Sequence, residues 1–171
     1  MSKYIDEIFT LQKGEDDREV NKVISNHFSK KINGILLRYN SLHITEINNP
    51  KYTSLTMEVR ELYFQEFYYS CVVMSCSIAE FVLRKIFFDN INTNKKHLSN
   101  KTQKYLSFIK AKTICEFLVS ESVIQKNLLA SFKILGELHS NYSNITDKSP
   151  KEDAKRALYH LHKILNQVDL N

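Results

Sequence analysis

Three side chains that lie close together in the sequence, His139, Asn141 and Tyr142, are of types that can do acid–base chemistry. A histidine titrates near neutral pH and can take up or release a proton, while asparagine and tyrosine can donate hydrogen bonds to an anion. The histidine also continues an apolar stripe at the spacing of one helix face. The stripe consists of Leu128, Phe132, Leu135 and His139, flanked by Leu138 and Tyr142. Because of this spacing we interpret His139 as a residue of the apolar core. The alternative is that its side chain transfers protons in a reaction.

The sequence indicates no metal site and no cofactor. His160 and His162 stand two residues apart, and such residues point apart on a helix, so we interpret them as structural surface residues. No carboxylate or cysteine completes a ligand set beside them. The 3 glycines are not clustered, which excludes a glycine-rich phosphate loop.

The stretch from Phe132 to Leu165 combines the end of a helix, a polar corner and a capped last helix. It resembles the carboxy-terminal half of HEPN domains, in which an arginine, a polar residue and then a histidine end a core helix. The equivalent residues here are Leu138-His139-Ser140-Asn141-Tyr142-Ser143-Asn144. His139 takes the place of the arginine, Ser140 that of the polar residue and Asn144 that of the histidine. The likeness extends weakly upstream to Glu58.

The resemblance implies a helical bundle and a function connected with RNA, because many HEPN proteins are RNA-cleaving toxins or defence proteins. Cleavage of that type needs a group that moves a proton at the ribose 2′-hydroxyl and a cation or donor that holds the phosphate. His139 would take the first role, with Tyr142 and Asn141 as donors and Asn144 beside them. Since both signature residues are replaced, we expect a non-catalytic HEPN-like module that binds RNA or a partner protein. The alternative is a metal-independent ribonuclease that uses the altered site.

The resemblance also suggests a biological setting and an assembly. Small HEPN-like proteins are common in prokaryotic defence, stress and toxin–antitoxin systems, and a protein of such a system is the expected partner. They commonly pair, so a symmetric homodimer is expected.

Arg38 and His43 form a second arginine and histidine at the spacing of the family motif. The spacing is undemanding, because Arg156 and His162 also meet it within one helix, where the two side chains lie on different faces. Arg38 and His43 are therefore an alternative site, and their weakness is that the family motif precedes the final helices.

The elements that must position these residues are predicted to be helices, because no segment alternates like a strand. Acidic residues after Gly14 suit the start of a first helix that runs to about Tyr39. The predicted segments that follow are a loop over 47–50, one long helix from Leu55 to Phe88, a polar connection from Asn90 to Thr102, a helix over 106–118 and a helix that ends near Tyr142. We predict an all-α, up-and-down bundle of about five main helices.

The last helix carries the strongest local signal. Ser149, Pro150 and Glu152 form a capping box with proline at the first helical position. One apolar stripe follows, made of Ala154, Ala157, Leu158, Leu161, Leu165 and Val168.

The long helix has more apolar surface than one neighbour can cover. The amino-terminal segment or a second copy of the chain could cover the surplus. Glu80 and Arg84, one turn apart on this helix, are interpreted as a partly buried structural pair.

Composition places the chain among globular, helix-rich proteins, with 43% hydrophobic and 25% charged residues in 171. That length suits one domain, with residues 1–16 as a docking arm or a frayed terminus. The 24 basic residues among 19 acidic ones give a mild bias toward polyanions. The odd count of 3 cysteines within apolar patterns indicates a reducing cytoplasm. No signal peptide or membrane-spanning run is expected.

Overall fold

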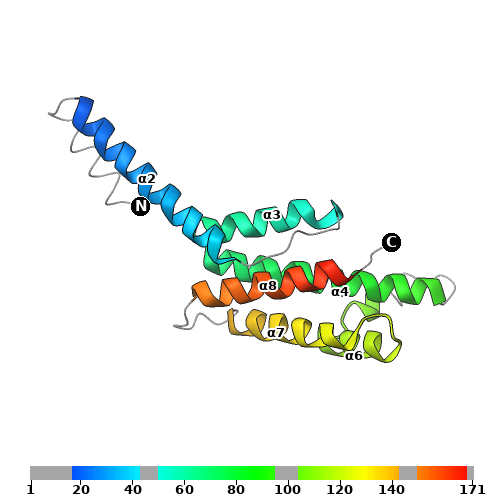
Figure 1. The fold of residues 1–171 in the computed structure, drawn as a ribbon. Coiled ribbons are helices and arrows are strands. Elements are labelled where there is room, and N and C mark those ends of the chain that lie inside the picture. The colour runs from blue at the N-terminus through cyan, green and yellow to red at the C-terminus, as the bar shows by residue number, and fades with distance from the viewer. Residues whose placement is uncertain (1–16, 43–49, 95–103, 143–149, 169–171) are drawn as a thin grey trace. The chain divides into compact units, whose positions relative to one another are not determined.

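The computed structural model describes residues 17–42, 50–94, 104–142 and 150–168, and their regular structure is entirely α-helical (Figure 1). The prediction of an all-α fold is therefore confirmed. The contacts group into two compact units, Met1–His43 and Ile44–Asn171. Since only one helix of the first unit is described, the count of one domain stays a prediction.

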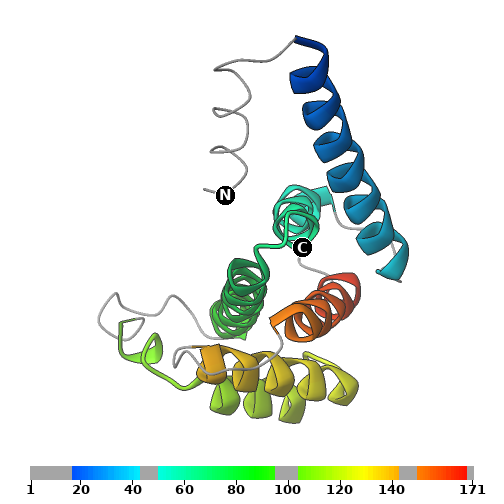
Figure 2. The ribbon, with the colours of Figure 1, turned by 90° about the vertical axis from the view of Figure 1, so that its left-hand side faces the viewer.

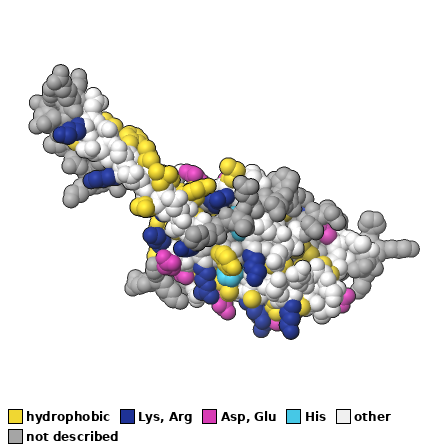
Figure 3. Space-filling model, viewed as in Figure 1, with side chains coloured by type: hydrophobic (Ala, Val, Ile, Leu, Met, Phe, Trp, Pro, Cys, Tyr) yellow, Lys and Arg dark blue, Asp and Glu magenta, His cyan; other side chains and the backbone are white. Residues whose placement is uncertain are grey.

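The described part of the first unit is helix α2, Asp17–Ser41. Its end lies two residues from the predicted one, and the Ser41 hydroxyl donates to the Arg38 carbonyl at 2.8 Å. Three large apolar side chains of this helix, Phe28, Ile32 and Leu36, remain more than half exposed. Hydrophobic side chains run along the helix in Figure 3. The predicted arm over 1–16 lies outside the described residues.

The second unit is a bundle in which two helices share the centre. Helix α4, Tyr68–Asn94, and helix α8, Pro150–Gln167, lie side by side (Figures 1 and 2). Helix α3, Pro50–Phe64, packs against both of them, and helix α7, Lys126–Tyr142, packs against both as well. Helix α6, Ala111–Ser120, packs on α7 and α4. The described residues of this unit thus form a five-helix bundle.

The broad apolar surface of α4 is used inside this unit. Four helices contact α4, and Cys71, Val72, Val82 and Leu83 are almost completely buried among them. The helices of this unit cover most of this surface without the amino-terminal segment or a second copy, although Phe81 remains 61% exposed.

The prediction of one long helix from Leu55 to Phe88 was also wrong, because the chain breaks at Glu66. The Phe67 N–H donates to the Leu62 carbonyl at 2.8 Å and the Glu66 N–H to the Tyr63 carbonyl at 3.2 Å. This pair of bonds is a Schellman motif, with Glu66 in the left-handed region at φ 68°. Glycine usually marks such an end, and a glutamate at that place gives the sequence no signal.

The same motif ends α6. The Val123 N–H donates to the Leu118 carbonyl at 2.9 Å, the Ser122 N–H donates to the Val119 carbonyl at 3.1 Å, and Ser122 has φ 57°. The predicted separation of the helix that ends at residue 118 from the helix that ends near Tyr142 is confirmed, with the break between Ser120 and Lys126.

Two other boundaries differ from the prediction. Helix α4 continues through Asn90 to Asn94, so the polar connection begins later than expected, and residues 95–103 lie outside the described part. Helix α6 begins only at Ala111, because Lys110 is extended with ψ 138°. Residues 104–109 form a short helical turn of their own.

The last helix matches its prediction closely. Pro150 is its first residue and Glu152 and Asp153 lie in its first turn, where carboxylates favour the positive end of the helix dipole. Ser149, the predicted cap, lies outside the described residues. All members of the predicted stripe are buried: Ala154, Ala157, Leu158, Leu161, Leu165 and Val168. No helix within the described ranges is long and apolar enough to cross a membrane.

Candidate functional site

A groove of about 690 Å³ lies between α4, α6 and α7. Its floor is apolar because each helix turns its buried face toward the other two. The floor includes Cys76 and Leu83 of α4, Cys115 of α6, and Phe132 and Leu135 of α7, all of them buried. A groove of this size and lining is large enough for a ligand.

Polar side chains surround this floor. They include Glu80 of α4, Lys112 of α6, and Lys133, Glu137 and His139 of α7. Two lysines and two glutamates leave the rim close to neutral, apart from the histidine. The groove therefore does not favour a polyanion through net charge alone.

The structure places His139 on this groove and contradicts its interpretation as a core residue. His139 is exposed, whereas Leu138 is only 3% exposed and Tyr142 is buried as well. From Leu135, a step of three residues leads to Leu138 and a step of four to His139, and both steps fit a helical stripe. The packing of α7 on α4 and α8 buries Leu138 and leaves His139 outside the core.

Tyr142 does not line the groove and acts as a link between three helices. Its hydroxyl donates to Oδ2 of Asp153 on α8 at 3.0 Å, and its carbonyl accepts from the hydroxyl of Tyr69 on α4 at 3.0 Å. The two tyrosine rings are 5.6 Å apart. Burial, and then the neighbouring Asp153 carboxylate, raise the pKa of Tyr142 to about 12. We therefore assign Tyr142 a structural role instead of the predicted donor role.

The other predicted site residues are only partly brought together. Asn141 lines the groove with His139, while Asn144 lies outside the described residues. Arg38 is half-buried near the end of α2, and its predicted companion His43 also lies outside the described residues. The alternative pair therefore stays a prediction.

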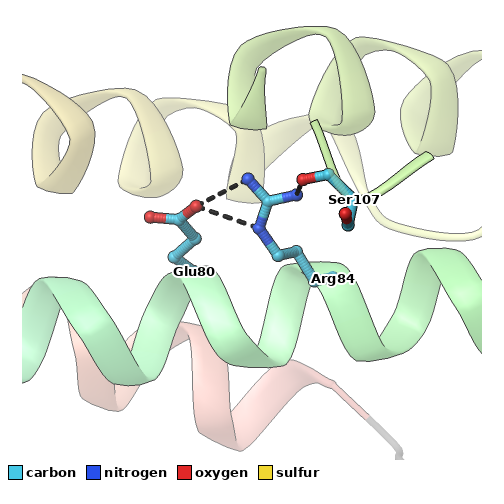
Figure 4. Close-up of polar contacts among 3 residues, drawn as sticks. All are labelled: Glu80, Arg84 and Ser107. Atoms are coloured by element: carbon cyan, nitrogen blue, oxygen red, sulfur yellow. Dashed lines mark hydrogen bonds and ion pairs between the residues drawn. The ribbon is translucent and has the colours of Figure 1, made fainter. Parts of the chain in front are cut away.

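Glu80 and Arg84 form the pair that the sequence indicated, and the structure adds a third partner. Both Nε and Nη2 of Arg84 donate to Oε1 of Glu80, at 2.9 and 2.7 Å. Nη1 donates to the carbonyl of Ser107 at 2.9 Å, so the guanidinium holds the turn over 104–109 against α4 (Figure 4). Reasoning from sequence missed this contact because it joins positions 23 residues apart.

No family model matches the chain, and neither the curated proteins nor the solved structures contain a match. The HEPN resemblance therefore rests on the residues quoted above.

The two thiols in the groove are not reactive groups. The Cys76 thiol donates to the Leu135 carbonyl at 3.2 Å. Burial raises the pKa of Cys76 to about 12 and that of Cys115 to about 11, so both stay protonated at neutral pH. A protonated thiol is neither a nucleophile nor a metal ligand.

The two histidines of α8 were interpreted as surface residues, which is wrong for His162, while His160 is partly buried. Nδ1 of His160 lies 3.1 Å from the hydroxyl of the fully buried Ser131, and His162 is itself buried. Because Ser131 has no exposed surface, its hydroxyl cannot reach a substrate as a nucleophile paired with His160. Within the described ranges, no three His, Cys, Asp or Glu side chains gather as a metal site.

Proposed function

We propose that the chain is a HEPN-like module that binds RNA without cleaving it, in a prokaryotic defence or stress system. The observation that supports binding without cleavage is the groove between α4, α6 and α7, whose rim of two lysines, two glutamates and His139 has no arginine among its described lining residues. The setting follows from the resemblance alone.

The chemistry of the rim favours binding over cleavage. Lys112 and Lys133 are mobile point charges that attract phosphate, whereas an arginine can hold a phosphate in a fixed bidentate geometry. The nearest arginine on α4, Arg84, already donates to Glu80 and Ser107. A phosphate held loosely is not aligned for attack by the 2′-hydroxyl, and alignment supplies much of the rate in such a reaction.

The test is incubation of the purified protein with total RNA, with and without a chelator. We expect intact RNA in both, together with weak binding in a filter or mobility-shift assay that falls steeply as salt rises. Cleavage by the wild-type protein would contradict the proposal.

A metal-independent ribonuclease is the second candidate, favoured by the position of Glu80 and His139 on one groove. It requires RNA cleavage that survives the chelator and is lost in His139→Ala. Cleavage that survives His139→Ala and disappears in Arg38→Ala or His43→Ala would instead place the site in the first unit.

A protein partner and self-association belong to the same proposal. The apolar floor of the groove would suit a partner protein of a defence or toxin–antitoxin system if no RNA binds. A homodimer is proposed because large apolar side chains stay exposed on α4 as well as on α2, among them Phe81 and Ile32.

A further inference from the structure

The positive charge of this chain is concentrated in one stretch. Residues 90–115 contain six lysines, one histidine and no acidic residue. The rest of the chain contains the other 18 basic residues and all 19 acidic ones, so its charges nearly cancel. The formal net charge of +5 therefore has its source in this stretch.

The described end of this stretch exposes two aromatic rings between lysines. Tyr105 is 67% exposed and Phe108 is 75% exposed. Lys104, Lys110 and Lys112 are exposed as well. We call these five residues the aromatic–lysine surface.

This surface has a defined backbone. The Phe108 N–H donates to the Tyr105 carbonyl and the Ile109 N–H to the Leu106 carbonyl, both at 3.2 Å. Leu106 and Ile109 are partly buried, and Nη1 of Arg84 binds the Ser107 carbonyl (Figure 4). The rings are thus presented outward by a turn that is attached to α4.

Few acidic groups offset the lysines. Glu80 is bound to Arg84, and Glu116 lies 4.0 Å from Lys112 in an exposed pair that salt screens easily. A polyanion is therefore the charge-complementary partner of this surface.

We propose that the aromatic–lysine surface binds single-stranded RNA, with unpaired bases stacked on Tyr105 and Phe108 and phosphates held by the three lysines. This inference rests on the proposed function and gives it a site outside the apolar floor of the groove. Exposed aromatic rings beside cations are what single strands need, because an unpaired base has a free face to stack and a base pair in a duplex does not. An apolar protein surface that buried the two rings would leave the lysines without anionic partners.

The experiment measures fluorescence anisotropy of a labelled oligouridylate of about twelve nucleotides with the full chain at several salt concentrations. Tyr105→Ala and Phe108→Ala should each weaken binding about tenfold. Tyr105→Phe should bind as well as wild type, because the ring remains. The matched control is Tyr159→Ala, which removes an exposed ring from α8 and should change little.

The lysines are tested by Lys104→Gln with Lys110→Gln in one variant. It should bind more weakly and lower the slope of log affinity against log salt by about 1 to 2. Lys126→Gln with Lys151→Gln removes the same charge from exposed positions on α7 and α8 and should keep the wild-type slope.

The outcomes separate the two proposals. If wild type binds and the aromatic variants bind equally well, the aromatic–lysine surface is not the site and the proposed function stands. If wild type binds no RNA at all, the proposed function fails and this inference fails with it. Equal affinity for a duplex of the same length would overturn stacking as the mode of binding.

Discussion

At the scale of single residues, two buried tyrosines differ in whether their hydroxyl groups have partners. Within the described part of the chain, the buried hydroxyl of Tyr63 has no hydrogen-bond partner, while that of Tyr142 donates to Asp153. A buried hydroxyl without a partner loses its hydration and gains nothing in return. We expect Tyr63→Phe to be neutral or to stabilise by up to about 1 kcal/mol.

The matched variant Tyr142→Phe should destabilise the fold by about 1 to 2 kcal/mol, because it removes a bond between α7 and α8. Urea denaturation of both variants checks the contrast. If Tyr63→Phe lost as much stability as Tyr142→Phe, the Tyr63 hydroxyl would have to have a hydrogen-bond partner.

The position of His139 predicts that its side chain contributes little to stability. His139→Ala should change the free energy of unfolding by less than about 0.5 kcal/mol, since the side chain is exposed. Its neighbour Leu138 is buried, and Leu138→Ala should cost about 2 to 5 kcal/mol. Thermal melts of the two variants make this comparison, and a large cost at His139 would restore the core interpretation.

His160 should make stability depend on pH. Burial, and then Arg156 and Lys163, lower its pKa in the folded protein below the usual 6.5. The unfolded chain then binds a proton more readily than the folded one, so stability is fully present above about pH 6.5 and is lost as pH falls through the folded-state pKa. Urea midpoints between pH 7.5 and 5 should fall for wild type and fall less for His160→Gln. If the urea midpoints of wild type and His160→Gln fell equally with pH, His160 would not be the source of the pH dependence.

At the scale of elements, the break between α3 and α4 depends on a strained residue. Glu66 occupies the left-handed region, which costs a residue with a Cβ roughly 1 kcal/mol and costs glycine nothing. Glu66→Gly should therefore raise the free energy of unfolding by about 0.5 to 1 kcal/mol.

The control for this variant is Glu58→Gly, at an exposed position inside α3, which should lower stability by about 1 kcal/mol. Chemical denaturation should move the two midpoints in opposite directions. A loss of stability in Glu66→Gly would show that this glutamate has contacts that outweigh its backbone strain.

At the scale of the whole molecule, the proposed homodimer has a direct readout. Exposed Phe81 on α4 and exposed Ile32 on α2 are apolar surface that a second copy would remove from water. Light scattering at micromolar concentration should return about twice the chain mass of 20.1 kDa. A mass of 20.1 kDa would contradict the dimer.

The helical class and the last helix could be predicted from sequence because they depend on local patterns. A proline at the first helical position and an apolar stripe at helical spacing specify α8 from its own residues. The i,i+4 pair of Glu80 and Arg84 is local in the same sense.

The candidate site was decided by tertiary packing. Periodicity allowed either Leu138 or His139 to face the core, and only the neighbours of α7 chose between them. The Tyr142–Asp153 bond and the Arg84–Ser107 bond join separate elements, so no spacing along the chain announces them. The turn at Glu66 escaped prediction because its left-handed backbone is held by packing and hydrogen bonds instead of by a glycine.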